Sequence, residues 1–161
     1  MQWKDQGIVI SLKRFGENKI IVTCLTNEHG RHMGVMRLSK KAEQVLHLGN
    51  FCELSWQARL PEHLGTWHPE NIYSAFATIF QDPLRLEALN TACCLIEKIL
   101  PEREPQKEIF NLFKEFVFNL AHENWAWFLI ELEFILLRYA GITLDFSSCA
   151  ATGDKQNLVF V

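Results

Sequence analysis

The apolar residues of this sequence change their spacing once, near residue 75, and this change constrains the fold more than any other feature. Before it, apolar residues alternate with polar ones or form short β-branched runs, as they do in strands. After it, they recur every three or four residues, as they do in amphipathic helices. Strands followed by helices are typical of an α+β chain. We therefore predict two domains, residues 1–78 and residues 79–161.

The first part of the chain contains five segments with strand patterns. In the first segment, Ile8, Ile10 and Leu12 are expected on one face, opposite Ser11 and Lys13. Five short strands within about 75 residues favour a small closed barrel, because closure removes the exposed edges of a sheet. A glycine inside the third segment, Gly34, fits the bend that such a barrel needs. The candidate strands are residues 7–15, 19–26, 31–38, 51–60 and 66–73.

The second part predicts a helical domain of at least three helices. Asp82 followed by Pro83 is typical of a helix start, and Asn124 is a candidate N-cap for the last helix. Gly141 fits a C-terminal cap. Residues 125–139 are apolar nearly all round, so we expect this last helix to be central and buried. The helices are expected over residues 82–100, from about 106 to 122, and 125–139.

The charge is divided between the two parts. The formal net charge of −3 excludes a uniformly basic nucleic-acid binder, but residues 1–75 carry nine Lys/Arg against seven Asp/Glu, a net of +2. Residues 76–161 carry seven against twelve, a net of −5. Opposite signs indicate different partners for the two domains.

The start of the chain lacks a signal-peptide pattern, and the apolar stretch 125–142 contains three charges, so we predict a cytoplasmic protein without a membrane span.

No enzyme motif is present, so we predict neither catalysis nor a cofactor. The five cysteines include no C-x-x-C pair, which argues against a disulfide framework and a four-ligand zinc site. Cys24, Cys52 and the pair Cys93-Cys94 fall in apolar segments and are interpreted as core residues. A zinc site from His29 and His32 is weakly supported, because a spacing of three on a strand places side chains on opposite faces.

Basic residues gather at strand ends and in the loop after the third strand. A barrel with cationic loops and exposed rings is a common platform for single strands, because bases stack on rings while Lys and Arg contact phosphates. Trp3, Phe15, Phe51 and Trp67 are candidate rings, whereas Trp56 is assigned to the core. The alternative is an ordinary solvated barrel surface. The candidate nucleic-acid-binding residues are Lys13, Arg14, Arg31, Arg37, Lys40, Lys41 and Arg59.

Several motifs follow one another along the chain in a specific order. They are Trp3-Lys4-Asp5-Gln6-Gly7-Ile8-Val9-Ile10, Gly16-Glu17, Thr26-Asn27-Glu28-His29-Gly30-Arg31, Leu48-Gly49-Asn50, Ala58-Arg59-Leu60, and Leu136-Leu137-Arg138-Tyr139-Ala140-Gly141 running into Cys149. Together they resemble the RecO family of bacterial recombination mediators. The resemblance implies an N-terminal OB-fold barrel followed by helices. It implies binding to single- and double-stranded DNA, annealing of strands coated by single-stranded DNA-binding protein, and loading of RecA together with RecR. It also implies a bacterial cytoplasmic protein associated with the nucleoid.

Three features depart from the family pattern. Cys149 lacks the second cysteine of a zinc knuckle, so we predict no structural zinc, and the basic run at Lys40-Lys41 is sparse. The chain ends on an apolar segment, 157–161, that resembles the beginning of a strand, so we expect a C-terminally truncated piece.

For the acidic helices we expect an apolar groove for the acidic tail of single-stranded DNA-binding protein, provided that Arg85 or Arg138 faces it. The alternative function is a protein-interaction adaptor that makes no contact with nucleic acid.

Overall fold

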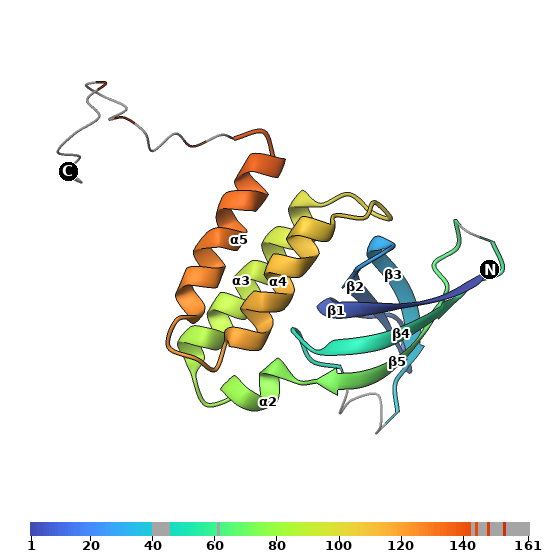
Figure 1. Cartoon of the computed structure of the whole chain (residues 1–161). Coiled ribbons are helices and arrows are strands. Elements are labelled where there is room, and N and C mark those ends of the chain that lie inside the picture. The colour runs from blue at the N-terminus through green and yellow to red at the C-terminus, as the bar shows by residue number, and fades with distance from the viewer. Residues whose placement is uncertain (40–45, 61, 143, 145–147, 149–152, 154–161) are drawn as a thin grey trace.

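The computed structural model describes residues 1–39, 46–60, 62–142, 144, 148 and 153 (Figure 1). In this part of the chain, five strands precede four helices, which confirms the predicted α+β class. The short helix α2 (Ala75–Ile79) was not predicted. The predicted terminal strand at 157–161 lies outside the described residues. The remaining elements are β1 (Gln2–Arg14), β2 (Lys19–Thr26), β3 (Gly30–Arg37), β4 (Phe51–Gln57), β5 (Thr66–Tyr73), α3 (Pro83–Ile99), α4 (Lys107–Asn119) and α5 (Trp125–Tyr139).

The strands close into a barrel in the order β1-β2-β3-β5-β4 (Figure 1). Neighbouring strands are antiparallel except at one closing contact, where Val35 of β3 pairs in parallel with Thr66 of β5. This contact brings the end of β3 beside the β4–β5 loop, residues 58–65. Loops that are distant in sequence therefore meet at one end of the barrel.

The prediction that Ile8, Ile10 and Leu12 share one face of β1 is wrong for Leu12. Ile8 and Ile10 both belong to the core shared with the helices, whereas Val9 faces the barrel interior. The register shifts between Val9 and Ser11, which marks a β-bulge. The bulge returns Leu12 to the barrel cluster, so the alternation read from the sequence does not continue through the strand. Both faces of β1 are buried because the helices cover one of them.

Two tryptophans fill the barrel core, and glycines make room for them. Trp56 and Trp67 are 1% and 2% exposed, respectively. A Cβ on Gly34 would lie 2.7 Å from the Trp67 ring, and one on Gly65, whose φ is +68°, would collide with the Trp56 ring. Gly34 therefore allows the Trp67 indole to pack closely against the backbone of β3, whereas the sequence suggested only that this glycine permits a bend.

The helix ends follow the sequence signals in two of three cases. Asp82 caps α3 by accepting a hydrogen bond from the Arg85 backbone N–H at 3.1 Å. At the end of α5, Gly141 has a φ of +85°, and its N–H donates to the Arg138 carbonyl at 3.1 Å. The Ile142 N–H donates to the Leu137 carbonyl, which completes a Schellman motif. Asn124 stands at the N-cap of α5 but makes no side-chain capping bond, contrary to the prediction.

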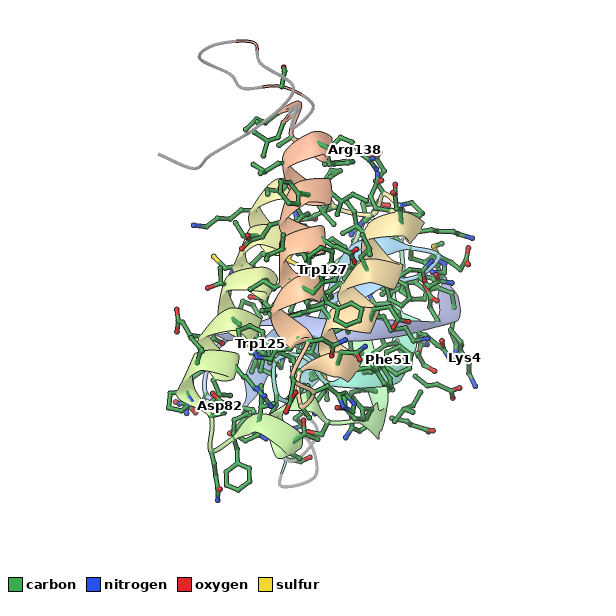
Figure 2. The ribbon with its side chains drawn as sticks, turned by 60° about the vertical axis from the view of Figure 1, so that its left-hand side comes forward. Lys4, Phe51, Asp82, Trp125, Trp127 and Arg138 are labelled. Carbon is green, nitrogen blue, oxygen red and sulfur yellow. The ribbon has the colours of Figure 1, made fainter. Side chains whose placement is uncertain are left out.

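The prediction that residues 125–139 form the central buried helix is wrong. Helices α3 and α4 lie between α5 and the barrel (Figure 1), and α4 carries the continuous buried face. Only Leu132, Ile135 and Leu136 of α5 are buried. Trp127 is 64% exposed on the outer face of α5 (Figure 2), and Ile130 and Phe134 of the same helix are 44% and 42% exposed. None of the helices in the described segments is long and apolar enough to cross a bilayer.

Candidate nucleic-acid interface

A groove crosses the outer surface of the barrel where β2, β3 and the β4–β5 loop meet. One part of it, of 630 Å³, and an adjacent part, of 390 Å³, share Gly65 and Thr66, so we describe them as one feature, the basic groove. The pairing of Val35 with Thr66 places its two sides together. The lining residues are Phe15, Asn18, Lys19, Val35, Arg37, Gln57, Ala58, Arg59, His63, Gly65 and Thr66.

Three exposed cations line the basic groove, and no carboxylate is present among its described lining residues. Lys19 and Arg37 are register partners across β2 and β3, and Arg59 follows β4. Within the described segments, none of these three side chains forms an ion pair. Phe15 adds a ring that is 51% exposed. The groove therefore offers unpaired positive charge next to a stacking surface, which is what a nucleic-acid strand requires.

Lys19 was not predicted as a site residue, because a single lysine at the start of an apolar strand carries no motif. The signal that would have found it is the antiparallel register of β2 and β3. Once Thr26 is paired with Gly30 across the turn, that register places Lys19 opposite Arg37. A predicted hairpin with a fixed turn thus identifies the partner of any candidate residue.

The structure divides the predicted DNA-binding residues into three groups. Arg37 and Arg59 line the basic groove, and Arg14 is exposed at the end of β1. Lys13 and Arg31 are bound to helical-domain groups: Lys13 forms an ion pair with Glu97, and Arg31 Nε donates to the Leu100 carbonyl at 2.9 Å. An Arg31 guanidinium nitrogen also lies 3.6 Å from Glu102. Lys40 and Lys41 lie outside the described residues.

Of the four rings proposed for base stacking, two are in the core. Phe51 and Trp67 are 4% and 2% exposed, so the expectation that they face DNA is wrong. Phe51 packs edge-on against Phe118 of α4, at the contact between barrel and helices. Trp3 is half-buried and stacks on His29 at a centroid distance of 3.7 Å. Phe15 alone of the four is freely exposed.

Another depression on the barrel has the opposite character. Asp5, Glu53 and Glu70 line it, together with a single lysine, Lys4. Three carboxylates against one ammonium repel phosphate. The modest net charge of residues 1–75 therefore conceals a separation of charge over the described barrel surface, and of these two depressions the basic groove is the one that suits a polyanion.

His32 is a buried histidine at the centre of an aromatic cluster. It is 5% exposed, and neither ring nitrogen has a hydrogen-bond partner among the described residues. Trp3, Trp56 and Trp67 surround it at centroid distances of 4.7–5.9 Å. Burial, assisted by the nearby charge of Arg103, lowers the pKa of His32 from 6.5 to about 4. The folded protein thus holds this imidazole neutral at pH values where the unfolded chain protonates it.

This pKa predicts a loss of stability in mild acid. Because the unfolded state binds the proton and the folded state does not, the contribution of His32 is present above pH 6.5 and falls as the pH drops toward 4. We expect a loss of about 2 kcal/mol in the free energy of unfolding between pH 7 and pH 5. Urea titrations at both pH values measure it. His32→Phe should remove most of this pH dependence, whereas His68→Phe, at an exposed position, should retain it; equal slopes would contradict the assignment.

Of the four cysteines predicted in the core, Cys24, Cys52 and Cys93 are buried, whereas Cys94 is exposed. Burial raises the pKa of the Cys52 thiol to about 12 and raises those of Cys24 and Cys93 as well, so these thiols stay protonated and unreactive. In the described ranges, no cluster of three or more His, Cys, Asp or Glu side chains could hold a metal ion. Cys149 lies outside those ranges.

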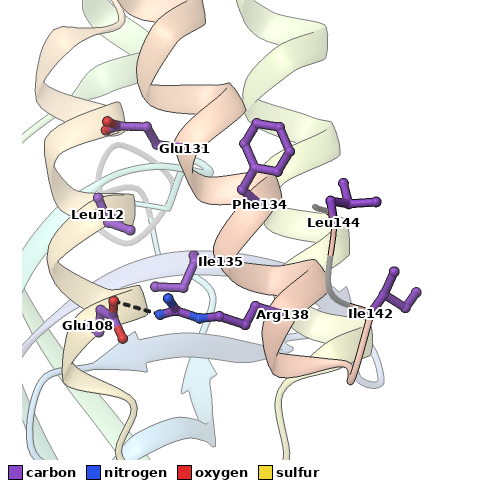
Figure 3. Close-up of a pocket in the computed structure, with 8 residues that line it drawn as sticks. All are labelled: Glu108, Leu112, Glu131, Phe134, Ile135, Arg138, Ile142 and Leu144. Carbon is purple, nitrogen blue, oxygen red and sulfur yellow. Dashed lines mark hydrogen bonds and ion pairs between the residues drawn. The ribbon is translucent and has the colours of Figure 1, made fainter. Parts of the chain in front are cut away.

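The helical part has a separate apolar pocket of 490 Å³ between α4 and the outer face of α5 (Figure 3). Arg138 faces it, which meets the condition set for an acidic peptide, but a guanidinium nitrogen of Arg138 contacts Glu108 at 2.9 Å. Glu131 lies on the rim, where it accepts a hydrogen bond from the Trp127 indole. Arg85 does not line this pocket; it donates to the Ala121 carbonyl at the other end of the bundle. The remaining lining residues are Leu112, Phe134, Ile135, Ile142 and Leu144.

A closed five-stranded barrel with this strand order defines the OB-fold class, whose members bind oligonucleotides or oligosaccharides on the face of strands 2 and 3 and on the adjoining loops. The basic groove occupies that position. Residues 1–75 match the family model described as "Recombination protein O N terminal", and residues 81–161 match "Recombination protein O C terminal". The chain belongs to the RecO family, whose curated members are DNA repair proteins.

The relatives match over the whole chain. The DNA repair protein RecO of Wolbachia sp. subsp. Drosophila simulans is 36% identical over 163 residues, covering all of this chain and 68% of the relative. The RecO proteins of Rhodospirillum centenum and Cereibacter sphaeroides are 41% and 37% identical, with 66% and 68% of their lengths covered. The chain thus spans about two thirds of the length of these relatives.

Proposed function

We propose that this protein is a non-enzymatic recombination mediator that binds single- and double-stranded DNA in the basic groove. The observation that carries the proposal is the set of three unpaired cations, Lys19, Arg37 and Arg59, beside the exposed ring of Phe15. Their position on strands 2 and 3 and the β4–β5 loop is the position that OB folds use for oligonucleotides. Membership of the RecO family gives the process, DNA repair and recombination.

In this proposal the two domains have separate tasks. The barrel, residues 1–78, neutralises phosphates and so lowers the repulsion that opposes the pairing of two strands, which promotes annealing. The helical domain, residues 79–161, contacts proteins: single-stranded DNA-binding protein, and RecR for the loading of RecA. We also propose Arg14, and Lys40 and Lys41, which follow Arg37 closely in the chain, as DNA-binding residues. Lys13 and Arg31 have smaller parts in the proposal because both are bound to groups of the helical part. The DNA partner implies action at the nucleoid in the bacterial cytoplasm.

Binding to a labelled oligothymidine in a series of salt concentrations tests the DNA assignment. Each phosphate contact releases counterions, so the logarithm of the binding constant should fall with the logarithm of salt, with a slope of about −0.7 per contact. A gel shift at low salt also separates the alternative, an adaptor that acts only through proteins. Absence of any shift for single- or double-stranded DNA would favour the adaptor and reject the proposal.

For the tail of single-stranded DNA-binding protein we propose the apolar pocket beside α5 (Figure 3). Arg138 supplies a cation for an acidic peptide, while Glu108 and Glu131 oppose it. We therefore expect weak binding, with a dissociation constant of tens of micromolar, that strengthens in Glu108→Gln because the variant frees Arg138. Calorimetric titration of the tail peptide measures both values. No heat from either protein at these concentrations would reject the site.

A further inference from the structure

The connection between α3 and α4 is fixed against the barrel. Arg103 in this connection has a φ of +62°, which is uncommon for a residue other than glycine. Its backbone N–H donates to the Arg31 carbonyl at 2.9 Å, and Glu102 forms a parallel bridge with Arg31. On the barrel side, a Cβ at Gly30 would collide with the Glu104 backbone. These contacts hold the connection in one position beside the start of β3.

From this position the Arg103 side chain reaches the β4–β5 loop. Its guanidinium donates to the backbone carbonyl of His63 at 3.2 Å and lies 3.4 Å from that of Glu62. The next residue of the loop is held from inside the barrel, where the Trp56 indole donates to the Leu64 carbonyl at 3.3 Å. The loop is therefore bound on one side by the barrel core and on the other by the helical domain.

The same loop forms one wall of the basic groove. His63 and Gly65 line the groove directly, and Arg59 lies at the beginning of the loop. We infer that Arg103 is a positioning residue for DNA binding: it holds the β4–β5 loop so that Arg59 and His63 stand opposite Lys19 and Arg37. The inference rests on the proposed function of the groove. It makes the helical domain part of the DNA site without requiring that any helix contact DNA.

Two mechanisms give Arg103 an effect on DNA binding, and salt separates them. If Arg103 contacted a phosphate, its removal would flatten the salt dependence of binding by about 0.7 units of slope. If it positions the loop, its removal lowers the affinity because the free loop must then be ordered on binding. The slope stays unchanged, because Arg59 still reaches its phosphate in the bound state and the number of neutralised phosphates is the same. The backbone carbonyls that its guanidinium contacts favour the second mechanism.

The test compares Arg103→Ala with Arg85→Ala in the full chain. Arg85 is a matched control because its guanidinium also donates to a backbone carbonyl, that of Ala121, far from the groove. Loss of a charge-assisted hydrogen bond at an exposed site predicts an affinity for oligothymidine about fivefold lower in Arg103→Ala. Amide hydrogen exchange of residues 62–65 should be faster by a similar factor in that variant. Arg85→Ala should match the wild-type protein in both measurements.

A double-mutant cycle gives a further readout that general destabilisation would not mimic. Arg103→Ala should be non-additive with Arg59→Ala, which lies in the positioned loop, and additive with Arg37→Ala on β3. Arg103→Lys, which can still donate to the His63 carbonyl, should recover part of the affinity.

Four results would overturn the inference: unchanged exchange in the loop, unchanged affinity, a flatter salt slope, or additivity with Arg59→Ala. If the wild-type protein binds no DNA, the proposed function fails by itself. The exchange measurement, which needs no DNA, then still shows whether Arg103 holds the loop.

Discussion

Replacing Lys19, Arg37 and Arg59 together with alanine should weaken binding to single-stranded DNA by about 100-fold at low salt, at roughly 1 kcal/mol for each lost contact. All three side chains are exposed and line one groove, and none has a carboxylate partner in the described segments. Loss of three phosphate contacts should flatten the salt dependence by about 2 units of slope. Fluorescence anisotropy of a labelled oligothymidine across a salt series measures both effects.

A second triple variant controls for the lost net charge. Lys4, Lys98 and Lys107 are exposed and lie outside the basic groove, and Lys4 is on the acidic side of the same barrel. Their replacement with alanine removes the same charge but should change affinity and slope only slightly. Equal effects of the two variants would show that binding follows overall charge and not the groove. Lys13→Ala and Arg31→Ala should each have less effect than Arg37→Ala, because both side chains are already bound to helical-domain groups.

Trp67→Ala should destabilise the protein by about 4 kcal/mol, which is a large part of the stability of a domain this size. The ring is 2% exposed, meets the edges of Trp3 and His32, and covers Gly34. Its indole nitrogen donates to the Val22 carbonyl at 3.1 Å, so truncation leaves a cavity and removes a buried hydrogen bond. Urea-induced unfolding, followed by circular dichroism, gives the difference.

Trp127→Ala is the matched control, since the same side chain is removed from a position that is 64% exposed on α5. We expect a change within about 0.5 kcal/mol, as for most surface substitutions. A large loss of stability in Trp127→Ala would indicate that the outer face of α5 is covered in solution. A small loss in Trp67→Ala would contradict the packing of the barrel core.

Local patterns identified the elements, but not always the faces that they bury. The five strands and three of the four described helices were predicted, because strand alternation, helical spacing and the Asp82 and Gly141 caps are local signals. The prediction that Leu12 shares a face with Ile8 and Ile10 was wrong, since the bulge between Val9 and Ser11 turns Leu12 toward the barrel cluster. Phe51 and Trp67 were wrongly predicted on the DNA surface, because an aromatic ring in a strand can face the core or the solvent, and strand alternation alone does not say which.

The amino-acid sequence by itself determined the α+β order, the ends of most elements, the family, and the presence of a basic barrel next to acidic helices. Tertiary structure decided which cations act together. The parallel contact of β3 with β5 joins Arg37 to the β4–β5 loop, the hairpin register adds Lys19, and ion pairs with the helical domain occupy Lys13 and Arg31. Periodicity depends on neighbours along the chain, whereas a groove depends on strand closure and register between distant segments, which no local pattern specifies.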